Sequence, residues 1–302
     1  MARRNDDTGG RPPILRRKDL DAPSVFTPEA LLREARRQKG IDSRQVPEVC
    51  ILDPDGDIVR HLLVTNRARR VHSWACYHTD LHAFEHDGLD YGVIGCAVGA
   101  AFAVLVAEEL FASGCKLLLS MTSAGQILPA QAPPYFVIID AALRDEGTSY
   151  HYLPPSEFSV ADERLVELAR ESLAAASISV QVGASWTTDA PFRETAEAIV
   201  AAQEAGILAV EMEAAALYAF ATARKQSVLC FAHVTNQMGL IEGDFEKGVA
   251  DGVAESLTVI SQLARRWRSL SAGGVNGGIL GHSLAEEAGN EGGPPGRAAE
   301  SA

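Results

Sequence analysis

Two glutamates stand two positions apart where an alanine-rich run begins. They are Glu211 and Glu213, in the stretch VEMEAAALYA over residues 210–219. The run favours a buried helix, and an ionised carboxylate at its start is costly unless hydrogen bonds stabilise it. The helix dipole supplies only part of that stabilisation. The pair is therefore interpreted either as ordinary first-turn residues or as acceptors for a hydroxyl-rich ligand, of which a ribose is the obvious candidate.

The composition narrows the range of partners. The chain of 302 residues is 47% hydrophobic, with a formal net charge of -13 and a pI near 5.1. This charge argues against nucleic acid polymers and anionic membranes as partners, so a bound phosphate would need a local basic pocket. Five cysteines, an odd number with no CxxC pair, favour reduced thiols over a disulfide framework. With no signal peptide and no apolar run of membrane-spanning length, we expect a cytoplasmic protein.

A group of histidines invites a metal assignment. His78, His82 and His86 are spaced as on one face of a helix, but residues 79–84 also alternate as a strand would. We expect a solvated edge or a subunit contact here, and no metal site.

Short β-type runs alternate with helical runs through the middle of the chain. Strands are expected at 49–52, 89–94, 116–120, 136–139, 177–182 and 228–234, and helices at 100–112, 160–176, 195–205, 212–223 and 248–266. This alternation predicts an α/β sandwich around a mostly parallel or mixed sheet. Ligands of such folds gather at the carboxyl ends of strands, where residues 55–60, 122–125, 187–193 and 235–237 fall.

The two ends of the chain differ from this middle part. Residues 1–23 are polar, with glycine and proline pairs, and are interpreted as a flexible arm. Residues 271–302 are rich in Gly, Ala and Glu and are expected to be disordered, because they cannot bury enough apolar surface. A single folded domain is therefore expected over 24–270.

Several motifs between Val49 and Arg266 occur in one order and together resemble the nucleoside phosphorylase family. That family includes uridine phosphorylases, hexameric purine nucleoside phosphorylases and related nucleosidases. The resemblance rests on GDIVR (56–60), TSAG (122–125), RDEGTSYHY (144–152), TD (188–189) and EME (211–213). It implies a three-layer α/β/α sandwich with a mixed, partly closed central sheet, assembled as a homodimer or hexamer.

The resemblance also implies roles around the sugar and the phosphate. Glu213 would accept hydrogen bonds from the ribose hydroxyls and favour positive charge on the sugar in the transition state. Met212 would pack on the sugar face, and Glu211 would orient its neighbours or contact the sugar. Phosphate would be held by Gly56, Arg60 and Ser123. The alternative for Arg60 is a surface arginine paired with the acids of its own turn, Asp53, Asp55 or Asp57.

Two departures bear on the nucleophile. Ser120 stands where phosphorylases carry a second phosphate-binding arginine, and the loss of a guanidinium removes charge-assisted hydrogen bonds of about 1.5–3 kcal/mol each. The TSAG sequence over 122–125 is closer to the corresponding motif of the nucleosidases, which use water.

The base end differs as well. Asn236 occupies the position of the aspartate that acts as general acid in purine phosphorylases and nucleosidases. An amide cannot protonate a leaving group, but it can hydrogen-bond charge that develops on the base. Gln237 follows it, and Phe192 and Arg193 are candidates to stack on the base and to reach an acceptor. The alternative for Phe192 and Arg193 is a hydrophobic anchor beside a surface arginine.

The sequence thus predicts an enzyme that cleaves the N-glycosidic bond of a nucleoside with phosphate, with Asn236 and Glu213 as its catalytic residues. Inorganic phosphate would be the co-substrate, and no cofactor is expected. The alternatives are a hydrolytic nucleosidase and a nucleoside-binding protein with weakened catalysis. The base, purine or pyrimidine, is left open.

Overall fold

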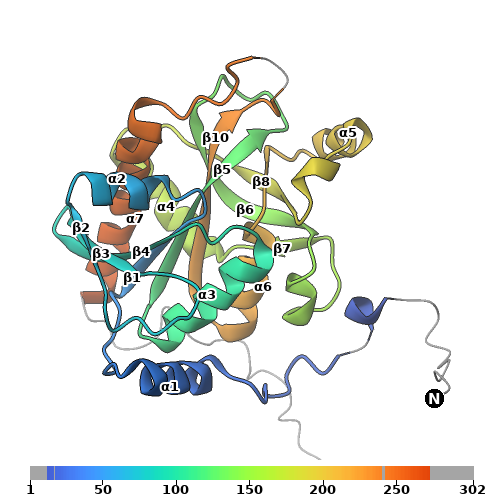
Figure 1. Ribbon diagram of the computed structural model, residues 1–302. Coiled ribbons are helices and arrows are strands. Elements are labelled where there is room, and N and C mark those ends of the chain that lie inside the picture. The colour runs from blue at the N-terminus through green and yellow to red at the C-terminus, as the bar shows by residue number, and fades with distance from the viewer. Residues whose placement is uncertain (1–11, 17, 240–241, 273–302) are drawn as a thin grey trace, which may run out of the picture.

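A ten-stranded mixed sheet forms the centre of the computed structural model, which describes residues 12–16, 18–239 and 242–272 (Figure 1). Its strand order is β10-β6-β8-β9-β5-β1-β4-β3-β2, with β7 paired to β6. The strands are β1 (Val49–Asp53), β2 (Ala68–Arg70), β3 (His82–His86), β4 (Leu89–Gly95), β5 (Leu117–Gln126), β6 (Tyr135–Asp145), β7 (Phe158–Val160), β8 (Gln181–Thr188), β9 (Ala209–Glu211) and β10 (Ser227–Asn236).

One half of the sheet closes into a ring. Strand β10 pairs with β6 on one side and with β5 on the other, so β5, β9, β8, β6 and β10 form a closed five-stranded barrel. The pairs β5–β10, β6–β8 and β8–β9 are parallel, and β5–β9 and β6–β10 are antiparallel. The expected mixed, partly closed sheet is confirmed.

Helices cover both faces of the sheet. In Figure 1, α3 (Ala100–Ala112) and α6 (Ala214–Arg224) lie together on one face, and α2 (Asp57–Val64), α4 (Glu163–Ala175) and α7 (Val253–Ala272) lie on the other. The helix α1 (Pro28–Lys39) packs near α3, and α5 (Ala196–Glu204) packs beside β8 and β9. Four 3-10 turns complete the described elements: η1 (Pro13–Leu15), η2 (Ser149–His151), η3 (Pro191–Arg193) and η4 (Val249–Gly252).

The helix α3 shows how directly the sequence specifies some elements. Its bounds match the expected helix over 100–112, and it buries seven of its residues, as expected for a helix that is apolar nearly all round. Gly99 caps its start with a φ of 89°, and Gly114 follows its end with a φ of 107°.

Other elements differ from expectation. The strand expected at 177–182 is wrong, since residues 177 and 178 close the preceding helix. Ser177 takes a φ of 57°, and Ile178 N–H donates to Leu173 O at 2.9 Å, so β8 begins only at Gln181. Of the three spaced histidines, His82 and His86 lie at the two ends of strand β3 and His78 lies in the loop before it, so they form no helix. The neighbouring strand β2 ends the sheet.

The predicted domain boundaries are not tested here, and most of the two predicted end segments, residues 1–11, 17 and 273–302, lies outside the described ranges. Within the expected arm over 1–23, Lys18 Nζ lies 3.0 Å from His151 Nδ1 in η2. The boundaries at 23 and 271 stay predictions. Within the described ranges, none of the helices combines the length and the apolar character that a bilayer crossing requires.

The turn between β1 and α2 requires a glycine at position 56. Gly56 has a φ of 76°, and a Cβ there would lie 2.7 Å from Cys96 Sγ. Gly88, in the tight turn between β3 and β4, has a φ of 75° but open space around a Cβ. An alanine would therefore have a strained backbone at both positions, but only at position 56 would its Cβ also lie too close to a neighbouring atom.

We predict that Gly56→Ala destabilises the fold more than Gly88→Ala does. Left-handed strain alone costs about 1–2 kcal/mol and should appear in both variants. The contact with Cys96 should add about 1–3 kcal/mol to the cost of Gly56→Ala alone. Urea unfolding of both variants measures the difference, and equal free energies of unfolding would contradict the packing account of this turn.

Candidate active site

Glu213 lies buried between the middle of β5 and the loop that leads into α3. It is only 1% exposed and is the N-cap residue of α6. One carboxylate oxygen accepts from Gly99 N–H at 2.7 Å, and the other accepts from Thr122 Oγ1 at 3.0 Å. A carboxylate has about four acceptor sites, so two donors leave acceptor capacity for a ligand.

Glu211 differs from Glu213 in the number of its donors. It accepts from Ser185 Oγ at 2.9 Å, from Thr187 Oγ1 at 2.5 Å, and from the N–H groups of Glu213 and Ala214, both at 2.7 Å. Burial raises the pKa of Glu211, and these four donors oppose that shift by stabilising the carboxylate. The geometry therefore favours Glu211 as the residue that orders the start of α6, which is one of the two roles predicted for it.

The pKa of Glu213 is raised to about 8, first by burial and then by the negative charge of Glu211. With these protein groups alone around it, a large fraction of Glu213 is therefore protonated near neutral pH. A diol that donates to the carboxylate would favour its ionised form. Met212, between the two glutamates, is half-buried, and its contact with a sugar stays a prediction.

The three predicted phosphate ligands come together through a residue that the prediction did not include. Gly56 caps α2, and Arg60 lies on the first turn of that helix. Ser123 N–H donates to Asp55 Oδ2 at 3.0 Å, and Asp55 directly precedes Gly56. The structure thus brings Gly56, Arg60 and Ser123 to one place, but a carboxylate already accepts from the Ser123 amide.

In this structure, Arg60 forms the ion pair that the sequence offered as the alternative to phosphate binding. Its side chain is 59% exposed and donates to Asp57 Oδ1 at 2.6 Å. This is the pairing with the acids of its own turn that the sequence left open, and its phosphate role stays a prediction. Ser120, at the position of the second arginine, is buried, and its hydroxyl has no hydrogen-bond partner among the described residues.

Lys247 is a member of the site that the sequence did not reveal. Its Nζ lies 2.5 Å from Asp57 Oδ2 and 3.3 Å from Asp55 Oδ2. The segment that carries it folds back from the end of β10, where Asp244 accepts from Gln237 N–H and Gly239 N–H. No local motif marks this lysine, since its partners lie almost 200 residues earlier in the chain.

A third aspartate adds to the negative charge of this turn. Asp53, at the end of β1, is buried and accepts from Val59 N–H at 2.9 Å. Burial, followed by the charges of Asp55 and Asp57, raises its pKa to about 7. We call the end of the site that is predicted to bind phosphate the anion end. Three aspartates make it acidic, and its two cations, Arg60 and Lys247, both have carboxylate partners.

The predicted base ligands separate into two groups. Asn236 is buried at the end of β10 and accepts from Met238 N–H at 3.0 Å, and its amide nitrogen lies 3.4 Å from Ala124 O. Gln237 is exposed beside it. Phe192 and Arg193 lie on η3, where Phe192 is 99% exposed and Arg193 is exposed. The structure places the first pair at the end of β5 and leaves the second pair on the surface.

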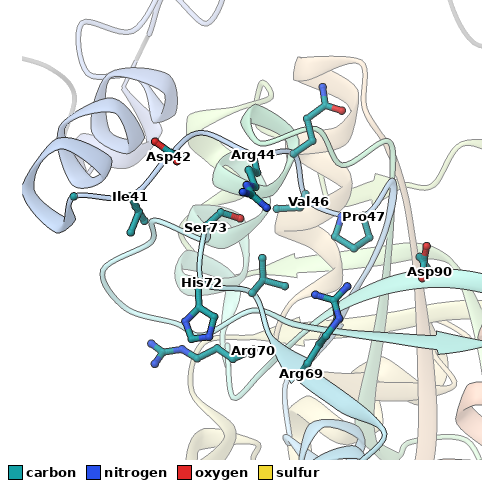
Figure 2. Close-up of a pocket in the computed structure, with 14 residues that line it drawn as sticks. Ile41, Asp42, Arg44, Val46, Pro47, Arg69, Arg70, His72, Ser73 and Asp90 are labelled. Atoms are coloured by element: carbon teal, nitrogen blue, oxygen red, sulfur yellow. The ribbon is translucent and has the colours of Figure 1, made fainter.

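Three further arginines line a separate cavity. This cavity has a volume of about 680 Å³. Figure 2 shows Arg44, Arg69 and Arg70 among its lining residues. The cavity also involves Val46 and Pro47, which precede β1, whereas the candidate site follows the carboxyl end of that strand. Arg44 also precedes β1, and Arg69 and Arg70 lie on the edge strand β2, which β4 and β3 separate from β1.

Comparison with known proteins agrees with this architecture. The sequence profile of the phosphorylase superfamily matches residues 56–266, which is well over half of the chain. The chain belongs to the phosphorylase superfamily. The matched range begins at Gly56 and includes both glutamates, Ser123 and Lys247, whereas Asp53 and Asp55 lie just before it.

Its relatives include several nucleoside phosphorylases. Guanosine phosphorylase of Halorubrum lacusprofundi is 29% identical over 167 residues, which are 54% of this chain and 66% of the relative. Uridine phosphorylase of Thermococcus kodakarensis is 25% identical over 236 residues, 68% of this chain and 84% of the relative. A DeoD-type purine nucleoside phosphorylase of Proteus mirabilis is 30% identical over 138 residues, 45% of this chain and 58% of the relative.

The fold has a counterpart among solved structures. Uridine phosphorylase from Vibrio fischeri ES114, solved with 6-hydroxy-1-naphthoic acid, matches with a TM-score of 0.63 at 19% identity. The match covers 74% of this chain and 92% of that one. At this identity the likeness establishes the fold, the expected three-layer sandwich.

We predict that Glu213→Gln flattens the pH dependence of stability. The pKa of Glu213 rises from 4.5 to about 8 on folding, so its contribution to stability is fully present below about pH 4.5 and is lost as the pH rises through 8. Within that window one such group contributes a slope of about 1.4 kcal/mol per pH unit. The variant should therefore gain stability relative to the wild type as the pH rises from 5 to 8.

Urea unfolding at several pH values measures this difference. Glu204→Gln, which removes an exposed carboxylate from α5, controls for the loss of one charge. A constant difference between Glu213→Gln and the wild type over this range would mean that Glu213 does not take up a proton on folding.

Proposed function

We propose that this protein cleaves the N-glycosidic bond of a nucleoside and holds the sugar through Glu213. The observation that supports this is the buried carboxylate of Glu213, which lies beside Thr122 of β5 and has two protein donors and unused acceptor capacity. Such a group has a high desolvation cost unless donors occupy it. A ribose diol offers two hydroxyl donors at the spacing of one carboxylate.

The same carboxylate would assist bond cleavage. As the bond to the base breaks, positive charge develops on the sugar, and an ionised Glu213 in a site with little water stabilises that charge. Asn236 would hydrogen-bond the departing base through its side-chain amide. Gln237, Phe192 and Arg193 are kept as proposed base contacts. Because Phe192 is almost fully exposed, its contact requires movement of η3 or a ligand that reaches out to it.

Two acceptors of the pentosyl group are candidates. Phosphate is supported by the placement of Gly56, Arg60 and Ser123 and by the relatives, whose names are those of phosphorylases. Transfer to phosphate would release the free base and a pentose 1-phosphate. Water is supported by one specific contact, the carboxylate of Asp55 on the Ser123 amide. A homodimer or hexamer in the cytoplasm is part of the proposal and follows from the family resemblance.

The experiment is an assay of base release from a panel of purine and pyrimidine nucleosides, with and without phosphate. We expect release from at least one nucleoside and a loss of turnover on the order of 100-fold or more in Glu213→Ala, because the variant lacks the acceptor for the diol and the charge that stabilises the transition state. Thermal unfolding of each variant checks that it folds.

Glu204→Ala removes an exposed carboxylate and should keep the wild-type rate. Unchanged turnover in Glu213→Ala would refute the role of this residue. Absence of release with every nucleoside, combined with thermal stabilisation by one of them, would identify a nucleoside-binding protein instead.

A further inference from the structure

The side chain of Asp55 occupies the place where an anionic ligand would bind. Its Oδ2 accepts from Ser123 N–H at 3.0 Å, so the backbone amide of a residue predicted to bind phosphate already has a negatively charged partner. The same oxygen lies 3.3 Å from Lys247 Nζ. A phosphate oxygen needs the same two kinds of partner, a backbone N–H and a cation.

The cations of this end of the site are also engaged. Arg60 donates to Asp57, and Lys247 contacts both Asp57 and Asp55. Burial lowers the pKa of Lys247, but the hydrogen bonds that it donates to Asp57 and Asp55, together with the charges of both aspartates, raise it overall. A phosphate entering here would have to displace a carboxylate from the amide while that carboxylate stays close by, and like charges at such a distance repel strongly in a partly buried site.

We propose that Asp55 is an internal anion that excludes phosphate and thereby makes water the acceptor of the pentosyl group. The acceptor assignment rests on the proposed function. In the reaction, the bond between C1′ and the base nitrogen breaks, and the oxygen of one water bonds to C1′. One proton of that water stays on the new sugar hydroxyl and the other ends on the base, so the products are a free pentose and a free base.

Asp55 thus determines which acceptor reacts, because it occupies the Ser123 amide and pairs with Lys247. In Asp55→Ala the amide is free, and Lys247 has one carboxylate partner less. The variant should therefore bind phosphate that the wild type rejects. Asp55→Asn keeps an oxygen acceptor for the Ser123 amide but removes the charge, so it separates the effect of charge from that of the hydrogen bond.

The test is a titration with inorganic phosphate alone, at constant ionic strength in chloride, followed by calorimetry or by phosphorus NMR. We expect Asp55→Ala to bind phosphate at least about tenfold more tightly than the wild type, since a single charge-assisted hydrogen bond already accounts for such a factor. Asp55→Asn should lie between the two, and Glu204→Ala should bind as the wild type does. Should Asp55→Ala fail to fold, Asp55→Asn, which preserves size and shape, must still bind more tightly than the wild type.

Two results would overturn the proposal: phosphate binding by the wild type as tight as by the Asp55 variants, or no phosphate binding by any of them. Because no nucleoside is present, this outcome does not depend on whether the protein cleaves one. A second readout follows the product. With the nucleoside that the wild type cleaves, Asp55→Ala should form pentose 1-phosphate in phosphate buffer, and the wild type should form free pentose.

Discussion

Burial of two carboxylates two residues apart at the start of α6 is the constraint on which the site depends. Both glutamates are almost inaccessible, and two adjacent buried charges are unfavourable unless donors surround them. Glu211 meets this constraint within the protein, with donors from β8 and from the helix itself. Glu213 has only two protein donors, one from β5 and one from the loop before α3, so its need for donors is met only in part. The ends of these elements are thereby fixed around one carboxylate that still has room for a ligand.

The two ends of the site differ in their electrostatics. The sugar end needs an acceptor, and a buried carboxylate supplies it. The anion end would need unpaired cations, but Asp53, Asp55 and Asp57 lie together there, and Arg60 and Lys247 are engaged with them. This local pattern agrees with the formal net charge of -13 of the whole chain. A neutral acceptor is therefore easier to accommodate at this end than a phosphate dianion.

The sequence predicted those parts of the molecule that local patterns encode. The apolar run over 100–112 between two glycines specified α3 to the residue, and the glutamate pair marked the buried start of α6. The sequence did not predict the contacts between segments that lie far apart in the chain. The bond from Ser123 to Asp55 spans 68 residues, and the contact from Lys247 to Asp57 spans 190. Both depend on how strands and loops come together, and no spacing along the chain reports them.

The most direct test of the central claim compares the binding of one ribonucleoside with that of its 2′,3′-dideoxy counterpart, by calorimetry, in the wild type and in Glu213→Gln. Hydrogen bonds from hydroxyls to a charged acceptor are worth about 1.5–3 kcal/mol each. The wild type should therefore bind the ribonucleoside at least about tenfold more tightly, and the variant should show little preference. Equal affinity of the wild type for both nucleosides would contradict the claim that Glu213 holds the sugar.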